Sequence, residues 1–126
     1  HFSNYFRHME AVEHAFFRSL GHSVAGKGRG RAVGWPRVHA ACDFSGPLCF
    51  EDEVEIQLLV AEVGQRSIVY QVVFRKLEAG AKVEVARGRL VVASVVWEKS
   101  GKLKAVPLPK EIRAQLQPAP GRLLKA

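Results

Sequence analysis

The first twenty-one residues, HFSNYFRHMEAVEHAFFRSLG, are the feature that most constrains the fold of this chain. When residues 2–20 are wound at about 3.6 residues per turn, their large apolar side chains fall on one broad face. These side chains are those of Phe2, Tyr5, Phe6, Met9, Val12, Phe16 and Leu20. Ser3 or Asn4 can cap the start of this predicted helix, and Gly21 suits its end, where a positive φ is favoured. A helix with such a face must pack against something large.

The rest of the chain supplies that surface as strands. The predicted strands cover residues 33–45, 54–63, 67–77 and 82–97. The last of them is almost continuously apolar after Arg89, which indicates burial on both faces. Short turns between successive strands favour an antiparallel sheet. We therefore expect an α+β fold in which one long helix is wrapped by a curved antiparallel sheet.

The end of the chain is predicted to add little to this core. Pro109 is expected in the first turn of a short C-terminal helix that Leu108-Pro109-Lys110 opens. Residues 118–126 contain Pro, Gly and Lys and are expected to fray. With 126 residues and no internal repeat, we expect a single domain over residues 1–126.

Composition narrows the function only in part. The formal net charge of +7 favours an anionic partner such as nucleic acid, a membrane surface or a phosphate-bearing small molecule, although a solvated basic surface explains it equally well. The Gly-rich segment 22–32 lacks the spacing of a phosphate-binding loop, so a mobile connection is the favoured interpretation over a phosphate or RNA contact. Cys42 and Cys49 have no metal-ligand spacing and are expected to be reduced thiols. With no long apolar run and no signal-peptide pattern, we expect a cytoplasmic protein without a membrane partner.

The N-terminal stretch, the strand series and the late PLPKEIRAQL resemble the hot-dog fold thioesterases of the 4-hydroxybenzoyl-CoA thioesterase type. The likeness is strongest at Phe2-Ser3-Asn4-Tyr5 with Glu10, and at Pro107-Leu108-Pro109. It implies a hot-dog fold and an acyl-CoA substrate, with no cofactor and no metal. It also implies a homodimer or tetramer whose subunits join their sheets edge to edge, with the acyl-CoA sites at the subunit interface.

One part of the family motif is absent from the sequence. In the family an Asp, followed by a few small residues and a Gly, comes just before the position of His1, and that Asp is the catalytic carboxylate. That Asp would lie about six residues upstream of His1. Its carboxylate would attack the thioester carbonyl or activate a water. We therefore expect a first strand and the start of the active-site loop to precede the given residues.

The resemblance assigns roles to residues at the start of the helix. Phe2 is expected to offer its backbone N–H to the oxyanion, because the first N–H groups of a helix have no partner within it. Asn4 orients the upstream Asp or caps the helix, and Tyr5 is expected to contact the substrate. Glu10 is a candidate catalytic or orienting carboxylate, because a second branch of hot-dog thioesterases carries its Glu at a similar place. Glu10 can equally pair with a neighbour on the helix surface.

Further residues are expected to hold the nucleotide or to carry a buried charge. The family places Arg66, Ser67 and Arg87 near the CoA phosphates, and the planar donors of Arg suit phosphate oxygens; a solvated Arg at a strand end is the alternative. Glu13 lies nearer the apolar face than a charged side chain should, so it must be paired or have a shifted pKa. We favour its reaching the edge of the subunit interface.

Three functions remain as hypotheses. The first is an acyl-CoA thioesterase that releases free CoA and a carboxylic acid, and the second is a non-catalytic hot-dog module that binds acyl-CoA or acyl carrier protein. The third, a nucleic-acid-binding domain, has little support, because only Phe74-Arg75-Lys76 combines an aromatic with basic residues. We predict the first, without nucleic acid as a partner. Its acyl pocket would be lined by Phe2, Phe6, Met9 and Trp35.

Overall fold

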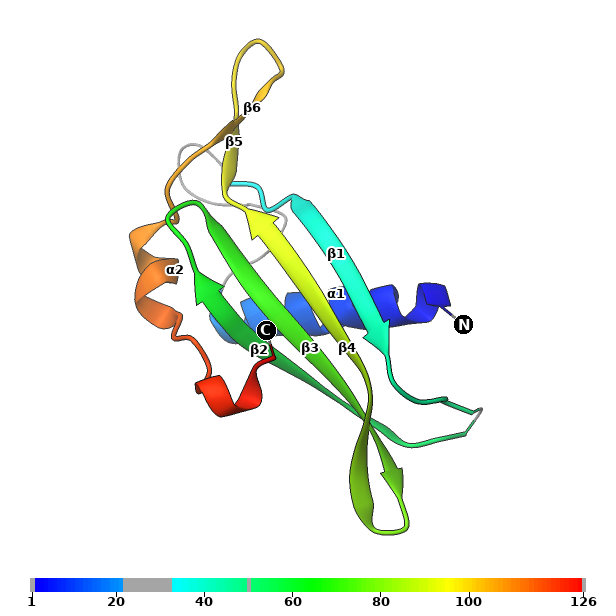
Figure 1. Ribbon diagram of the computed structural model, residues 1–126. Coiled ribbons are helices and arrows are strands. Elements are labelled where there is room, and N and C mark those ends of the chain that lie inside the picture. The colour runs from blue at the N-terminus through cyan, green and yellow to red at the C-terminus, as the bar shows by residue number, and fades with distance from the viewer. Residues whose placement is uncertain (1, 22–32, 50, 126) are drawn as a thin grey trace.

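A computed structural model describes residues 2–21, 33–49 and 51–125, except for the side chains of Phe2 and Ser3. It confirms the predicted α+β architecture, because one long helix lies against a curved antiparallel sheet (Figure 1). The elements are α1 (Phe2–Ser19), β1 (Arg37–Phe44), β2 (Val54–Val63), β3 (Ser67–Glu78), β4 (Ala81–Ala93), β5 (Val95–Trp97), β6 (Leu103–Ala105), α2 (Lys110–Gln115) and a 3-10 helix, η1 (Gly121–Leu123). The Gly-rich segment 22–32 lies outside the described residues.

The main sheet has the strand order β1-β4-β3-β2, with every neighbouring pair antiparallel. The central strands β3 and β4 are the longest, and β1 forms one edge. Irregular register interrupts the ladder between Val60 and Glu62 and between Phe74 and Arg75. Such bulges bend a strand and increase its twist, which helps the sheet to curve around α1.

The predicted strand over residues 82–97 is two strands in the structure. β4 ends at Ala93, and the backbone N–H of Ser94 turns aside to donate to the carbonyl of Arg66 at 2.9 Å. β5 then pairs with β6 in a separate hairpin that projects from the body of the domain (Figure 1). The strand predicted over residues 33–45 also begins later in the structure, because β1 starts at Arg37. Pro36, just before it, has no N–H with which to extend the ladder.

The helix packs closely on the centre of the sheet. Met9 is fully buried and lies over Gly88 of β4, where an added Cβ would be 2.6 Å from the Met9 sulfur. Gly88 therefore lets α1 approach the sheet. Gly21 has a φ of +85° just after the helix, as predicted for its end. The predicted capping by Ser3 or Asn4 is wrong, because α1 already begins at Phe2 and both residues lie within its first turn.

The C-terminal part of the chain is more ordered than predicted. α2 forms directly after Pro109, as expected, and its Ile112 is buried. Residues 118–126 are predicted to fray, but residues 119–125 lie against the sheet, beginning with a 2.7 Å hydrogen bond from the Ala119 N–H to the Val60 carbonyl. Backbone groups of β2 and side chains of the sheet supply the partners that hold this segment. In the described residues no helix is both long and apolar enough to cross a membrane.

Candidate active site

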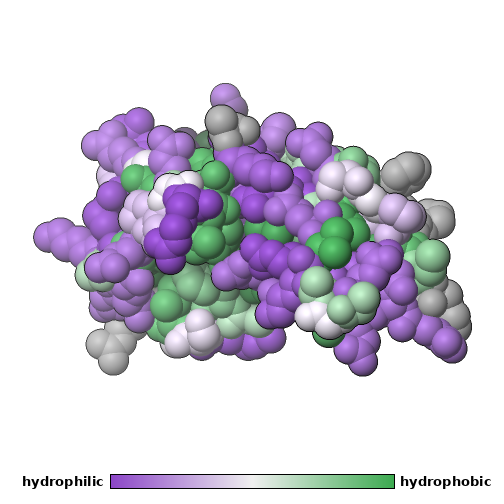
Figure 2. All heavy atoms as spheres, turned by 60° about the horizontal axis from the view of Figure 1, so that its bottom comes forward, coloured by the Kyte–Doolittle hydropathy of each residue, from purple (hydrophilic) through white to green (hydrophobic). Residues whose placement is uncertain are grey.

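A cavity of about 1030 Å³ opens at the N-terminal end of α1. It lies among the first turns of α1, the end of β1, the connection from β1 to β2, and the strands β2 and β3. Its walls are made by Asn4, Tyr5, His8, Phe44, Gly46, Pro47, Leu48, Cys49, Asp52, Val54, Ile56 and Phe74. A view toward the lower end of Figure 1 shows apolar side chains exposed among hydrophilic ones (Figure 2).

Aromatic side chains form the inner part of this cavity. The ring of Tyr5 lies 4.7 Å from that of Phe44 and 4.9 Å from that of Phe74, both edge to face. Edge-to-face contacts of this kind fix ring orientations. Burial, and then the nearby Cys42, raise the pKa of Tyr5, so its hydroxyl stays protonated at neutral pH. Tyr5 therefore lines the cavity, and its contact with the substrate stays a prediction.

Polar groups line the cavity from two elements. Asn4 and His8 are four residues apart on α1 and therefore share a face of the helix. Opposite them, the Asp52 carboxylate accepts the Cys49 backbone N–H at 2.6 Å and so holds the connecting loop. The sequence interpretation missed His8 and Asp52 as site residues. The spacing of His8 from Asn4 was the available signal for the first, and no local pattern pointed to the second.

The start of α1 gives the cavity a set of backbone donors. The first N–H groups of a helix have no intrahelical partner and carry partial positive charge. Because α1 begins at Phe2 while Asn4 and Tyr5 line the cavity, these donors are at the cavity end of the helix. This position suits the oxyanion role predicted for the Phe2 N–H, which stays a prediction.

Glu10 does not line the cavity. Its carboxylate is about half exposed and lies 3.4 Å from Arg37 Nη1, and the other guanidinium nitrogen, Nη2, lies 2.5 Å from the buried Glu13. Burial works to lower the pKa of Arg37, but the hydrogen bonds and charges of Glu13 and Glu10 outweigh it and raise that pKa. Glu13 is paired, which is one of the two alternatives expected for a buried charge there, and its partner lies on the edge strand β1. The favoured interpretation, that Glu13 reaches the edge of a subunit interface, stays a prediction. Arg37 thus ties α1 to β1, and Glu10 belongs to this cluster.

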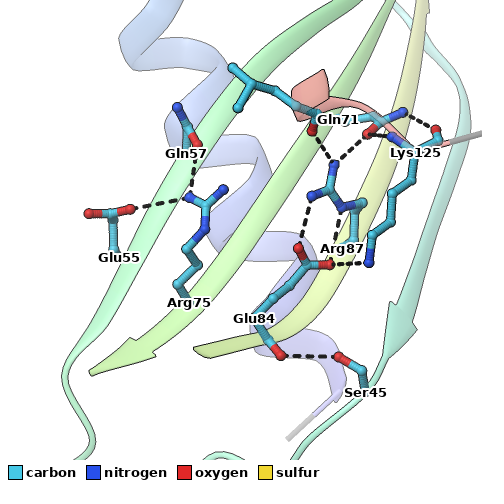
Figure 3. Close-up of polar contacts among 9 residues, drawn as sticks. Ser45, Glu55, Gln57, Gln71, Arg75, Glu84, Arg87 and Lys125 are labelled. Atoms are coloured by element: carbon cyan, nitrogen blue, oxygen red, sulfur yellow. Dashed lines mark hydrogen bonds and ion pairs between the residues drawn. The ribbon is translucent and has the colours of Figure 1, made fainter. Parts of the chain in front are cut away.

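The residues expected near the CoA phosphates do not line the cavity. Ser67 begins β3, while Phe74 of the same strand lines the cavity, and seven strand residues span about 23 Å. Arg87 is engaged on the face of the sheet away from α1, where it donates to Glu84 at 2.8 and 3.1 Å and to Gln71 at 2.8 Å (Figure 3). Within one chain, therefore, Arg66, Ser67 and Arg87 do not join the cavity.

Three residues expected in the acyl pocket are also placed differently. Met9 is buried in the core, and Trp35 packs on Phe17 at a ring distance of 5.2 Å, toward the C-terminal end of α1. Phe6 is partly exposed and is not a wall residue. Met9 and Trp35 stabilise the domain, and the cavity walls come from the first turns of α1, the end of β1, the connection from β1 to β2, and the strands β2 and β3.

Both cysteines are free thiols, although only Cys49 lines the cavity. Burial, with a smaller contribution from the charge of Asp43, raises the pKa of Cys42 to about 11. In the described part of the chain, no group of three or more His, Cys, Asp or Glu side chains could hold a metal ion.

Comparison with known proteins places this geometry in a family. The model of the thioesterase-like superfamily matches residues 1–116. The chain belongs to the thioesterase-like superfamily. Its fold is therefore the hot-dog fold of that superfamily, as the resemblance implied, with the sheet wrapped around α1.

Several known proteins are similar over most of the chain. A putative esterase of Aquifex aeolicus (strain VF5) is 29% identical over 113 residues, which are 89% of this chain and 80% of that protein. The structure of a gentisyl-coenzyme A thioesterase has a TM-score of 0.71 at 27% identity, over 90% of this chain and 85% of the other. The 4-hydroxybenzoyl CoA thioesterase of Pseudomonas sp. strain CBS-3 has a TM-score of 0.74 at 20% identity, over 90% and 84%, which shows the shared fold.

Proposed function

We propose that this protein is an acyl-CoA thioesterase that hydrolyses its substrate to free CoA and a carboxylic acid. The observation that carries the proposal is the cavity at the N-terminal end of α1, in a chain of the thioesterase-like superfamily. Helix N–H groups meet an apolar, aromatic cavity there, which is what an acyl thioester needs. The solved gentisyl-coenzyme A thioesterase supports CoA thioesters as the substrate class.

The chemistry we propose has two parts. A water, or a carboxylate, attacks the thioester carbonyl carbon, and the oxygen becomes an oxyanion that the Phe2 backbone N–H stabilises. The carbon–sulfur bond then breaks, and the CoA sulfur leaves as a thiolate that takes up the proton given up by the attacking water. Where a carboxylate attacks instead, it forms an acyl anhydride with the protein, and a water then hydrolyses this anhydride to release the carboxylic acid. By resemblance, the attacking or activating carboxylate is an Asp upstream of His1. In this chain Asn4 would orient the reacting groups, and Tyr5 would contact the acyl group.

The acyl group of this proposal is apolar. Ligand pockets have volumes of about 300 to 1,000 Å³, so a cavity of about 1030 Å³ has room for an acyl group and part of the pantetheine arm. Tyr5, Phe44 and Phe74 suit an aromatic ring, and Leu48 and Ile56 suit an aliphatic chain. The substrate class is therefore an aromatic or medium aliphatic CoA thioester.

We also propose that the active form is a homo-oligomer in the cytoplasm. Ser67 begins β3 about 23 Å along the strand from the cavity wall at Phe74, and Arg87 lies on the face of the sheet away from α1. We therefore propose that Arg66, Ser67 and Arg87 contact a CoA bound at the cavity of a second copy. The edge position of β1, with Val38 well exposed on it, supports an edge-to-edge contact between sheets. The two free thiols support a reducing compartment.

The test uses the gene product with its natural N-terminus. It is given a panel of aromatic and aliphatic CoA thioesters, and released CoA is followed with a thiol-trapping dye. We expect turnover with at least one class of acyl chain. Tight CoA binding without release would instead establish a non-catalytic binding module. Neither binding nor release across the panel would exclude both.

A further inference from the structure

The β5–β6 hairpin projects from the body of the domain, and its outer end carries two apolar side chains (Figure 1). Trp97 is 64% exposed and Leu103 is 46% exposed. They are partners in the register of the two strands, so they lie directly opposite each other. A two-stranded hairpin usually needs a third strand or a helix against its apolar side chains to be stable. Here the apolar pair of Trp97 and Leu103 stays exposed to solvent.

The base of the hairpin is fixed to the domain. Val95 and Val96 are buried. Val95 also exchanges two backbone hydrogen bonds with Gly34, at 2.8 and 3.0 Å. Where the second strand leaves the hairpin, the Val106 N–H donates to the Ser94 carbonyl at 2.8 Å. The exposed apolar pair is therefore carried on a buried, hydrogen-bonded base.

A tight turn orders the tip of the hairpin. The Gly101 N–H donates to the Glu98 carbonyl at 2.9 Å, and the Glu98 N–H donates to the Lys102 carbonyl at 2.8 Å. Gly101 has a φ of +87°, a conformation that glycine adopts without strain. The bonds of Glu98 close a short loop of a kind that is common in hairpins. The tip is thus a small, ordered and convex protrusion.

Three lysines surround the apolar pair. Lys99 lies in the turn, and Lys102 and Lys104 lie on either side of Leu103 in the sequence. All three are exposed, and none of them takes part in an ion pair among the residues that the structure describes. Glu98 is the single acidic residue of the hairpin. The protruding end therefore combines apolar surface with positive charge that no carboxylate neutralises.

This combination fits the surface of a bilayer that contains anionic lipids. Trp is favoured in the interfacial layer, because its ring is apolar while its N–H can meet the polar headgroups. Lysines near the surface are attracted to anionic lipids, and their long side chains can reach the headgroups from beside an apolar contact. A bilayer also accepts a convex protrusion, whereas a protein partner would need a groove of matching shape.

We propose that the β5–β6 hairpin docks this protein on a membrane surface that contains anionic lipids, with Trp97 and Leu103 in the interfacial layer and the three lysines beside the headgroups. The expectation of no membrane partner concerns a spanning segment, which surface docking does not require. In the described part of the chain, no hairpin residue lines the cavity. The proposal therefore does not depend on thioester hydrolysis.

The test uses the full chain with two kinds of vesicle, one of phosphatidylcholine alone and one of equal amounts of phosphatidylcholine and phosphatidylglycerol. Co-sedimentation measures the fraction of protein that is bound. In Trp35→Phe, Trp97 is the one remaining tryptophan, so its emission and its quenching by brominated lipids report whether this side chain enters the bilayer. The difference in quenching between the wild type and Trp97→Ser gives the same information without a change at Trp35.

We expect binding to the anionic vesicles and not to phosphatidylcholine alone, with a blue shift of the Trp97 emission. Trp97→Ser combined with Leu103→Ser should lower the partition coefficient by at least about tenfold, because it removes the apolar pair. The matched control, Leu77→Ser combined with Val83→Ser, changes two exposed apolar side chains near the tip of the β3–β4 hairpin and should leave binding unchanged. Circular dichroism checks that each variant is folded.

The charged contribution is tested in the same way. Lys99→Gln combined with Lys102→Gln should lower the partition coefficient by at least about tenfold. The control, Lys76→Gln combined with Lys82→Gln, removes the same charge from the β3–β4 hairpin and should have a much smaller effect. Equal losses in the two lysine variants would show that only net charge matters and would overturn the hairpin as the docking element.

Two further results would overturn the proposal. One is that the wild-type protein does not bind the anionic vesicles. The other is binding without a blue shift or quenching of Trp97, together with equally tight binding to soluble poly-glutamate. That second result would indicate an acidic protein as the partner of the hairpin.

Discussion

The layer between α1 and the sheet is closed at one end and open at the other. At the closed end Phe17 is almost fully buried against Trp35, and the buried Ile112 of α2 seals the edge. At the open end Tyr5 makes edge-to-face contacts at similar distances, yet a cavity of about 1030 Å³ remains beside it.

The difference between the two ends shows that aromatic contacts do not by themselves close a hot-dog core. Closure at one end comes from an extra element, α2, and no described element plays that part at the other end. The closed end therefore contributes stability, whereas the open end can admit a ligand. Substitutions at the two ends should affect different measurements.

The largest effect on stability is expected at the closed end. Phe17→Ala should lower the free energy of unfolding by about 3 to 5 kcal/mol, because it leaves a cavity in a packed core. Urea unfolding followed by circular dichroism measures it, with the partly exposed Phe6→Ala as the control. A loss below about 1 kcal/mol would contradict the packed character of this end.

The second largest effect on stability is expected at the ion-pair cluster of Arg37, Glu10 and Glu13, which lies between the two ends. Glu13→Gln keeps the volume of the side chain but leaves Arg37 without its buried partner, and should cost about 3 kcal/mol. Glu10→Gln changes the exposed partner of the same Arg37 and should cost less than about 1 kcal/mol. Equal losses in the two variants, measured by urea unfolding, would show that burial of Glu13 does not matter.

At the open end the expected effect is on activity. Leu48→Trp should fill part of the cavity and lower kcat/KM for CoA thioesters by at least about tenfold, which is about 1.4 kcal/mol. The free energy of unfolding should hardly change. Leu103→Trp, at an exposed site on the β5–β6 hairpin, is the control and should leave turnover intact. Loss of activity in both variants would contradict the proposal that this cavity binds the substrate.

The smallest expected effect is a difference in thiol reactivity. The exposed Cys49 should react with iodoacetamide at pH 8, and a bound CoA thioester should slow this reaction because Cys49 lines the cavity. Cys42 should react slowly, because its pKa of about 11 keeps it protonated, and faster only as the pH approaches that value. Intact mass and peptide mapping distinguish the two thiols. Labelling of Cys42 that is faster than labelling of Cys49 at pH 8 would contradict the burial that raises the pKa of Cys42.

How far the sequence predicts this protein depends on how local each feature is. The α1 helix and the boundaries of β2 were predictable, because their apolar periods extend over ten or more residues. The break at Ser94 was not, because the run LVVASVVW is apolar on both sides of the point where the strand changes its pairing partner. At the site, Asn4 and Tyr5 were found from a motif, whereas Asp52 enters the cavity only through the fold of a loop.

By itself, the sequence determined the long helix, the antiparallel strand series and the motif residues that resemble the thioesterases. These features follow from side-chain periodicity and from the chemistry of short segments. The sequence did not determine the whole buried face of the helix, since Phe17 is buried and the predicted Phe6 is exposed. The tertiary structure alone decided that Arg37 pairs with Glu13, that Arg87 donates to the Leu123 carbonyl, and which walls enclose the cavity. Those contacts join residues far apart in the chain, and their partners become neighbours only when the sheet curves around the helix.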